Sequence, residues 1–139
     1  MRAGYSKRTL IDKLGIKSGF VLIITNPPPS YFQLLGILPP GVKSKKSLSG
    51  EFDFIQSFVA NHKKLAVEFP KLKKHLKANG MLWISWPKGT SRMSSDLNEN
   101  SIRDTGLRNG LVDVKVCAID ENWSGLKFVF RLKDRKNEK

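Results

Sequence analysis

The sequence predicts an α/β fold built on a mainly parallel β-sheet. Two runs, residues 20–25 and 81–86, are almost wholly apolar, as expected for strands that are buried on both faces. Segments with apolar residues at helical spacing lie between the predicted strands, so strands and helices alternate along the chain. The last two predicted strands, 112–119 and 126–132, are separated by only six residues, a connection that requires an antiparallel hairpin.

In the first half of the chain, turn and cap residues mark the ends of the predicted elements. Ser6 and Ser30 are suited to capping the starts of two short helices, and Gly15 and Gly36 are suited to ending them. The three prolines at 27–29 stop the first apolar strand, because proline has no N–H to donate to a neighbouring strand. The elements predicted here are a helix at 7–14, a strand at 20–25, a short helix at 31–35, an edge strand around 42–46 and a strand at 52–59.

The second half continues the same alternation. Pro70 interrupts an apolar stripe at helical spacing, so we expect either a kinked helix or two helices that meet near this proline. Asn79 and Gly80 are expected to end that helix, and Asn98 or Asp96 is expected to cap the next one. The elements predicted here are a helix at 63–77, a strand at 81–86, a helix at 99–108 and hairpin strands at 112–119 and 126–132.

The length of 139 residues fits one domain, which we place at 1–133, followed by a charged tail at 134–139 that we expect to be frayed. No apolar run approaches the roughly 20 residues that a membrane span needs, and the N-terminus shows no apolar signal segment. One cysteine excludes a disulfide framework. We therefore expect a cytoplasmic protein with no membrane partner.

The net charge of +13 favours anionic partners. Lys and Arg number 25 against 12 Asp and Glu, and only seven of the 25 are Arg. Lys is a hydrated point charge, whereas specific phosphate recognition relies more on the planar fork of Arg. Three interpretations are therefore open: a solvated Lys-rich surface, a nucleic-acid-binding face and a local phosphate site. Asp113 and Lys115 alternate with valines and are expected on a solvated face of the sheet.

Several segments resemble known proteins. Residues 53–55, the helix that follows and residues 78–84 resemble the fourth strand, helix and fifth strand of Rossmann-like S-adenosylmethionine-dependent methyltransferases. Residues 4–131 also resemble a family of small uncharacterised bacterial proteins known as a domain of unknown function. The segments that carry this second resemblance are 4–6, 13–16, 85–88, 96–99, 110–121 and 123–127. The resemblance implies a compact methyltransferase-like fold and brings no known activity or catalytic residue.

The signals for a methyltransferase cofactor are missing from the sequence. Enzymes of this fold place a glycine-rich loop after the first strand, where this chain has Asn26, three prolines and Ser30. The acidic residue expected at the end of the second strand has no clear counterpart in 42–50. Asn26 and the first two prolines resemble the Asn-Pro-Pro-aromatic motif of amino-methyltransferases, but Pro29 replaces the aromatic residue and Tyr31 is the first ring. A rigid turn is the favoured interpretation, and no cofactor is expected.

No metal site or catalytic nucleophile is predicted. His62 and His75 lack the cluster of cysteine partners that a zinc site needs. Cys117 lies in an apolar strand, where a small buried side chain is the usual explanation. No serine lies in a G-x-S-x-G turn. The sequence therefore favours a non-catalytic protein.

The predicted site lies at the carboxyl edge of the sheet, where ligands bind in folds of this kind. Aromatic surface beside a cation and a carboxylate is suited to a small anionic or ring-bearing ligand. The alternative is that the tryptophans cap the core and that the Lys88 ammonium pairs with a nearby carboxylate. The candidate ligand-binding residues are Asn26, Tyr31, Trp86, Lys88, Arg92, Asp120 and Trp123.

The sequence thus predicts a small non-catalytic domain that binds a small anionic ligand or a protein partner at this edge. Two alternatives stay open. The excess of lysine allows a nucleic-acid-binding protein, whose affinity would fall steeply with salt. The resemblance allows a divergent S-adenosylmethionine-dependent methyltransferase that uses Asn26 and Tyr31.

Overall fold

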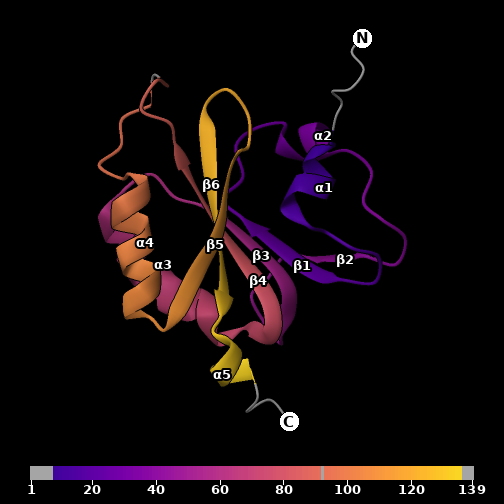
Figure 1. The fold of residues 1–139 in the computed structure, drawn as a ribbon. Coiled ribbons are helices and arrows are strands. Elements are labelled where there is room, and N and C mark those ends of the chain that lie inside the picture. The colour runs from indigo at the N-terminus through magenta and orange to yellow at the C-terminus, as the bar shows by residue number, and fades with distance from the viewer. Residues whose placement is uncertain (1–7, 92, 136–139) are drawn as a thin grey trace.

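A single β-sheet forms the centre of the fold. Over the described residues, 8–91 and 93–135, the computed structural model has five helices and six strands in the order β2-β1-β3-β4-β6-β5 (Figure 1). The elements are α1 (Leu10–Leu14), β1 (Val21–Thr25), α2 (Tyr31–Leu35), β2 (Lys43–Lys45), β3 (Phe52–Phe58), α3 (His62–Lys74), β4 (Leu76–Pro87), α4 (Glu99–Arg108), β5 (Leu111–Ala118), β6 (Trp123–Phe130) and α5 (Leu132–Arg135). The predicted α/β fold class is confirmed.

Strand direction divides the sheet into a parallel part and a hairpin. The pairs β2–β1, β1–β3 and β3–β4 are parallel. β6 runs antiparallel to both β4 and β5, so β5 points in the same direction as β4. The carboxyl ends of β1, β3, β4 and β5 therefore lie at one edge of the sheet, and the predicted C-terminal hairpin is confirmed.

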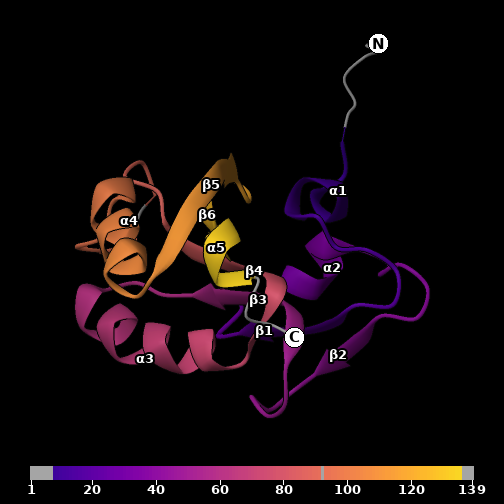
Figure 2. The ribbon, with the colours of Figure 1, turned by 60° about the horizontal axis from the view of Figure 1, so that its bottom comes forward.

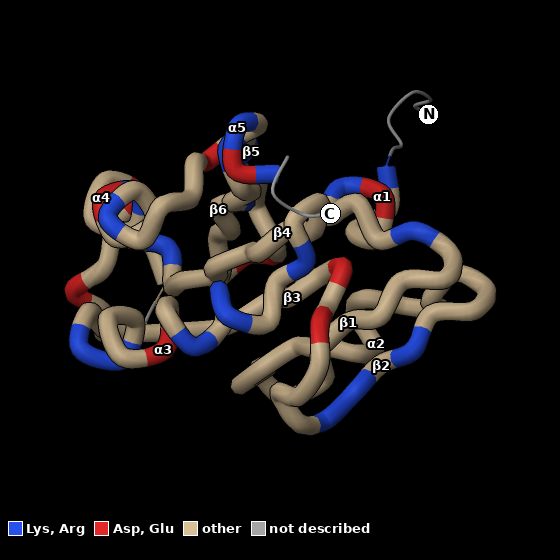
Figure 3. Tube along the Cα trace, turned by 90° about the horizontal axis from the view of Figure 1, so that it is seen from below, with Lys and Arg blue, Asp and Glu red and all other residues tan. Residues whose placement is uncertain are grey.

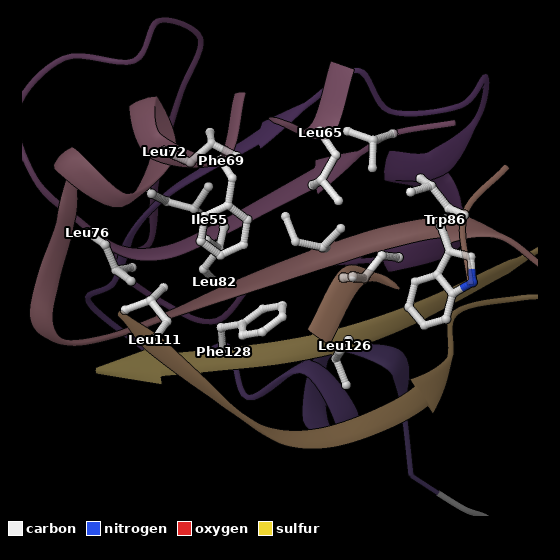
Figure 4. Packing of buried hydrophobic residues seen from close by; sticks show 14 of the residues in the cluster. Ile55, Leu65, Phe69, Leu72, Leu76, Leu82, Trp86, Leu111, Leu126 and Phe128 are labelled. Carbon is white, nitrogen blue, oxygen red and sulfur yellow. The ribbon is translucent and has the colours of Figure 1, made fainter. Parts of the chain in front are cut away.

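Helices cover both faces of the sheet. Figure 2 shows α3 and α4 together on one side and α1 and α2 together on the other. On the α3–α4 side, Phe69 meets Phe128 edge to face, with ring centroids 5.4 Å apart (Figure 4). Gly106 permits this packing, because a Cβ at that position would lie 2.0 Å from the Phe128 ring. As a result, α4 packs directly against β6.

On the α1–α2 side, a hydrogen bond fixes α1 to the sheet. Trp83 of β4 is fully buried, and its Nε1 donates to the carbonyl oxygen of Leu14 at 2.9 Å. Gly15 then ends α1 with a φ of 85°, a left-handed conformation that favours glycine. The prediction that Gly15 ends this helix is confirmed.

Two predicted helix starts differ from the structure. α1 begins at Leu10, and the Thr9 hydroxyl oxygen accepts a hydrogen bond from the Asp12 N–H, whereas Ser6 lies outside the described residues. Ser30 does precede α2, but its side chain makes no capping hydrogen bond. The prediction of a Ser30 cap is wrong because its backbone is left-handed, with a φ of 66°, instead of the extended form that caps adopt.

The boundary between α3 and β4 also differs from the prediction. α3 continues through Pro70 as one helix and ends at Lys74 instead of residue 77. Asn79 and Gly80, which were expected to end the helix, lie inside β4. A Cβ on Gly80 would lie 2.9 Å from the Phe52 carbonyl oxygen, at an irregularity in the β3–β4 pairing. The glycine therefore permits a close approach of two strands.

The described chain ends in a short helix. α5 includes Asp134 and Arg135, which the sequence placed in a frayed tail. Arg135 Nε donates to the Phe130 carbonyl oxygen at 2.9 Å, which ties this turn to β6. Residues 136–139, the rest of the predicted tail, lie outside the described residues. None of the described helices is long and apolar enough to cross a membrane.

Candidate functional site

A cavity of about 470 Å³ opens between the segment that follows β1 and the turn that joins β5 to β6. Figure 1 shows α2 and this turn at the same end of the molecule. The volume is typical of pockets for small molecules. The residues that line the cavity, here called the edge pocket, are Pro28, Pro29, Ser30, Tyr31, Leu34, Met93, Asp120, Asn122 and Trp123.

The segment after β1 forms a stiff wall of the edge pocket. Asn26 and Ser30 have left-handed φ angles of 56° and 66°, and the prolines between them have a fixed φ. The Tyr31 N–H donates to the Pro28 carbonyl oxygen at 3.1 Å, which closes the turn into α2. The wall is therefore preformed, and α2 begins with a ring at the pocket.

The Tyr31 hydroxyl bonds into the protein interior. It donates to Gln56 Oε1 at 2.8 Å, and Gln56 Nε2 donates to the Ser85 hydroxyl oxygen at 3.1 Å. Burial raises the pKa of Tyr31, the hydrogen bond with Gln56 lowers it, and the charges of Cys117 and Asp120 raise it further. The net shift is upward, so Tyr31 is a neutral phenol at neutral pH and anchors α2 to β3.

Three aromatic rings pack beneath the edge pocket. The Phe58 ring lies edge to face with Tyr31, at 4.8 Å between centroids, and with Trp123, at 5.0 Å. Tyr31 and Trp123 come from opposite ends of the chain, and both line the cavity. Mutually packed rings hold their orientation, so the edge pocket is built over a rigid and largely buried aromatic base.

Asp120 brings a negative charge to the edge pocket. Its Oδ1 accepts hydrogen bonds from the N–H groups of Asn122, at 2.8 Å, and Trp123, at 2.9 Å, which fixes the β5–β6 turn. Among the described residues that line the cavity, Asp120 is the one charged group. The charge of the pocket therefore suits a neutral or positively charged ligand.

Three of the seven predicted site residues line the edge pocket: Tyr31, Asp120 and Trp123. Trp86 does not join them, because it is buried in the core on the α3–α4 side (Figure 4). Successive side chains of a strand point to opposite faces, and Ser85, its neighbour in β4, already points to the α2 side. Trp86 therefore lies on the face of the sheet opposite to the edge pocket.

The other three predicted residues take different places. The Lys88 N–H donates to the Asn122 carbonyl oxygen at 2.8 Å, but the Lys88 side chain does not line the pocket. Asn26 lines a separate cavity of about 180 Å³ on the α3 side of β1, together with Glu68 and Lys71. Arg92 lies outside the described residues.

Six of the nine lining residues are not among the predicted site residues, and two of these six are large exposed apolar side chains. Leu34 and Met93 are apolar side chains that are 49% and 42% exposed, and both line the edge pocket. For Leu34 a signal exists, since it lies three residues after Tyr31 and shares its face of α2. Met93 lies in the irregular segment before α4, where no periodic pattern indicates which way a side chain points.

No curated protein and no family model matches the sequence. Solved structures match the fold. One is an S-adenosylmethionine-dependent methyltransferase from Aquifex aeolicus, with a TM-score of 0.58, 13% identity and 86% of each chain covered. A second is the magnesium protoporphyrin IX methyltransferase of Synechocystis with bound S-adenosylhomocysteine. Its TM-score is 0.56 and its sequence identity 11%, and the match covers 88% of this chain and 78% of that chain.

A third is the 1,6-didemethyltoxoflavin-N1-methyltransferase of Burkholderia thailandensis, at a TM-score of 0.56 and 14% identity, with 86% of this chain and 73% of that chain covered. The fold is that of the Rossmann-like S-adenosylmethionine-dependent methyltransferases. At these identities the likeness shows the fold and does not extend to activity.

The residues present do not fit S-adenosylmethionine in the glycine loop that this fold places after β1. The prolines at 27–29 have no N–H to offer, and the N–H groups of Tyr31, Gln33 and Leu34 donate to carbonyl oxygens within the turn and α2. β2 is followed by Lys46 and a serine instead of an acidic residue. In the described part of the chain, no group of three His, Cys, Asp or Glu side chains is arranged to hold a metal ion.

Proposed function

We propose that the protein is a non-catalytic binding domain whose edge pocket holds the ring of a small neutral or positively charged molecule. The observation that carries the proposal is the cavity of about 470 Å³, whose lining includes Tyr31 and Trp123. Apolar walls with a few polar groups are typical of small-molecule sites. The Asp120 carboxylate in the lining favours a cation over an anion.

The state of the polar groups supports binding without catalysis. The Tyr31 hydroxyl donates to Gln56, and its raised pKa keeps it protonated. Asp120 Oδ1 is occupied by two N–H groups of its own turn. The described lining of the pocket includes no His, Cys or Lys, the residue types that most often act as bases or nucleophiles.

A second candidate function is methyl transfer from S-adenosylmethionine. It is favoured by the fold, which is shared with methyltransferases solved with S-adenosylmethionine or S-adenosylhomocysteine bound. The three prolines after β1 argue against it, since they remove the N–H donors of the usual cofactor loop. The proposal of a binding domain is therefore preferred.

Calorimetric titration separates the two candidates. The probes are tryptamine, a ring-bearing cation; indole-3-acetate, an anion of similar shape; adenosine; and S-adenosylmethionine. We expect tryptamine and adenosine to bind, and indole-3-acetate to bind more weakly because Asp120 repels it. Leu34→Ala should weaken tryptamine binding. Ile37→Ala removes a similar apolar side chain just after α2, outside the pocket lining, and should not.

Two results would contradict the proposal. The first is no binding of either tryptamine or adenosine to the intact protein. The second is an equal loss of affinity in Leu34→Ala and Ile37→Ala, which would place the ligand elsewhere. Binding of S-adenosylmethionine alone, with release of S-adenosylhomocysteine when a methyl acceptor is added, would favour the methyltransferase instead.

A further inference from the structure

Four lysines from distant parts of the chain gather on the α1 side of the β5–β6 hairpin. Lys115 of β5 and Lys127 of β6 are directly opposite each other in the sheet register. The Lys115 ammonium donates to the carbonyl oxygen of Lys13, at the end of α1, at 3.1 Å. Lys17 follows α1 and acts electrostatically on Lys127. These four residues are called the lysine cluster below.

A bulge in β5 creates the cluster. Side chains two residues apart on a regular strand share a face, but the pairing of β5 with β6 shifts between Asp113 and Lys115. Asp113 consequently bonds to Arg103 of α4 on one face, at 2.9 Å, while Lys115 bonds to the end of α1 on the other. The expectation that Asp113 and Lys115 share a solvated face is therefore wrong.

The ammonium groups of the cluster act on common neighbours. Burial lowers the pKa of Lys127, and the charges of Lys115 and Lys17 lower it further. Burial raises the pKa of the Cys117 thiol, while the charges of Lys115 and Lys13 act in the opposite direction. The charges of Lys13 and Lys17 thus add to the positive potential around the Lys115–Lys127 pair.

No carboxylate neutralises this charge within residues 8–91 and 93–135. The ion pairs there join Lys77 to Asp53, and Arg103 to Glu99 and Asp113. The Lys13 carbonyl oxygen accepts a hydrogen bond from the Lys115 ammonium, but it is not a partner of the Lys127 ammonium. Like charges directly opposite each other destabilise a sheet. A bound anion would relieve the electrostatic repulsion between the half-buried Lys115 and Lys127.

We propose that the lysine cluster binds a phosphate group. A phosphate monoester carries close to two negative charges at neutral pH and three acceptor oxygens, so it can accept hydrogen bonds from several ammonium groups at once. A carboxylate carries one charge and would leave most of the repulsion in place. None of the four lysines lines the edge pocket, so this site stands whether or not the pocket binds a ring.

Thermal unfolding in phosphate and in chloride, at equal ionic strength and pH, tests the site. We expect inorganic phosphate to raise the Tm of the intact protein by several degrees more than chloride does. Lys127→Met keeps the apolar stem and removes the half-buried charge. It should reduce the phosphate effect to the general stabilisation that phosphate gives any folded protein, and it should raise the Tm in chloride, because the repulsion is relieved. Lys74→Met, on the exposed side of α3, is the matched control and should keep the phosphate effect.

A second variant covers the case in which Lys127→Met disturbs folding. Lys17 is exposed, so Lys17→Met leaves the core intact and should reduce the phosphate effect. Leu34→Ala alters the edge pocket alone and should leave the effect unchanged, which separates this site from the proposed function. Equal shifts in phosphate and chloride would overturn the inference, as would equal losses in Lys74→Met, Lys17→Met and Lys127→Met.

Two further ligands identify the source of the phosphate. Stabilisation by adenosine monophosphate that is lost in Lys127→Met would assign a small phosphorylated ligand. Stabilisation by a short single-stranded oligonucleotide alone, lost in the same variant, would assign a nucleic-acid backbone. Both results support the site. Either ligand stabilising Lys127→Met as well as the intact protein would contradict it. Figure 3 shows Lys and Arg on helices and strands all around the fold, so the part of the oligonucleotide effect that remains in Lys127→Met measures non-specific binding.

Discussion

The two faces of the sheet are packed in different ways. The α3–α4 face is filled by tightly fitted apolar side chains, with Gly106 bringing α4 onto the Phe128 ring. The α1–α2 face combines apolar packing with polar contacts, such as the bond between Trp83 and Leu14 and the chain from Tyr31 to Ser85, and it borders the edge pocket. We infer that the first face mainly supplies stability and that the second also supplies binding surfaces.

The largest effect on the free energy of unfolding is expected from a substitution that creates a cavity on the α3–α4 face. Phe69→Ala should lower the free energy of unfolding by about 3–5 kcal/mol, because it deletes a fully buried ring. Urea unfolding followed by circular dichroism measures the loss. At a temperature where the variant is folded, its affinity for a pocket ligand should be unchanged. A loss below about 1 kcal/mol would show that this face does not dominate stability.

The next effect tests the close packing of α4. Gly106→Ala should cost about 1–3 kcal/mol, because the added methyl group enters the space of the Phe128 ring and α4 must move outward. Gly89→Ala is the matched control, since a Cβ at Gly89 would meet nothing within 4 Å. Equal stability of the two variants, measured by the same urea unfolding, would contradict the packing described for α4 and β6.

The dependence of stability on pH at high pH tests the burial of the Tyr31 hydroxyl on the α1–α2 face. In the unfolded chain Tyr31 loses its proton near pH 10, whereas burial raises its pKa in the folded state. The unfolded state therefore binds fewer protons above that pH, and stability falls as the pH rises. Tyr31→Phe removes this contribution, so its urea midpoint should fall less between pH 9 and 11. Parallel curves for the two proteins would mean that the hydroxyl is not buried.

The smallest effect on the free energy of unfolding is expected from substitutions at the start of α4. The Asn98 side chain accepts from the Ser101 N–H at 2.9 Å, and the Ser101 hydroxyl completes the capping box. Asn98→Ala should cost about 1 kcal/mol, and Asn98→Asp, which keeps the acceptor, should cost little. Differential scanning calorimetry resolves a change of this size. An Asn98→Asp variant as unstable as Asn98→Ala would argue against the cap.

The sequence predicts an element well where neighbouring residues alone determine it. The apolar run at 20–25, the Asn98 cap of α4 and the C-terminal hairpin all depend on neighbouring residues alone. The prediction from Asn79 and Gly80 is wrong, because such a pair commonly ends a helix. Here Gly80 permits a close approach between β3 and β4, which depends on tertiary structure and not on the local sequence.

The edge pocket could be predicted in part. Strand order placed Tyr31, Asp120 and Trp123 at one edge, and the structure brings them together. Trp86 was misplaced because its face depends on the register of β4, which the apolar run does not fix. The lysine cluster could not be found from the sequence at all, since it depends on a bulge in β5 and on the position of α1.

The most direct test of the account uses the methionine methyl groups as reporters in an NMR titration. Met93 lines the edge pocket, whereas Met81 packs beside Gly15, beneath the end of α1. Titration of methyl-labelled protein with tryptamine should shift the Met93 signal with saturation and leave the Met81 signal in place. Saturable binding that leaves Met93 unmoved, or that shifts Met81 equally, would contradict the claim that the ligand site is the edge pocket.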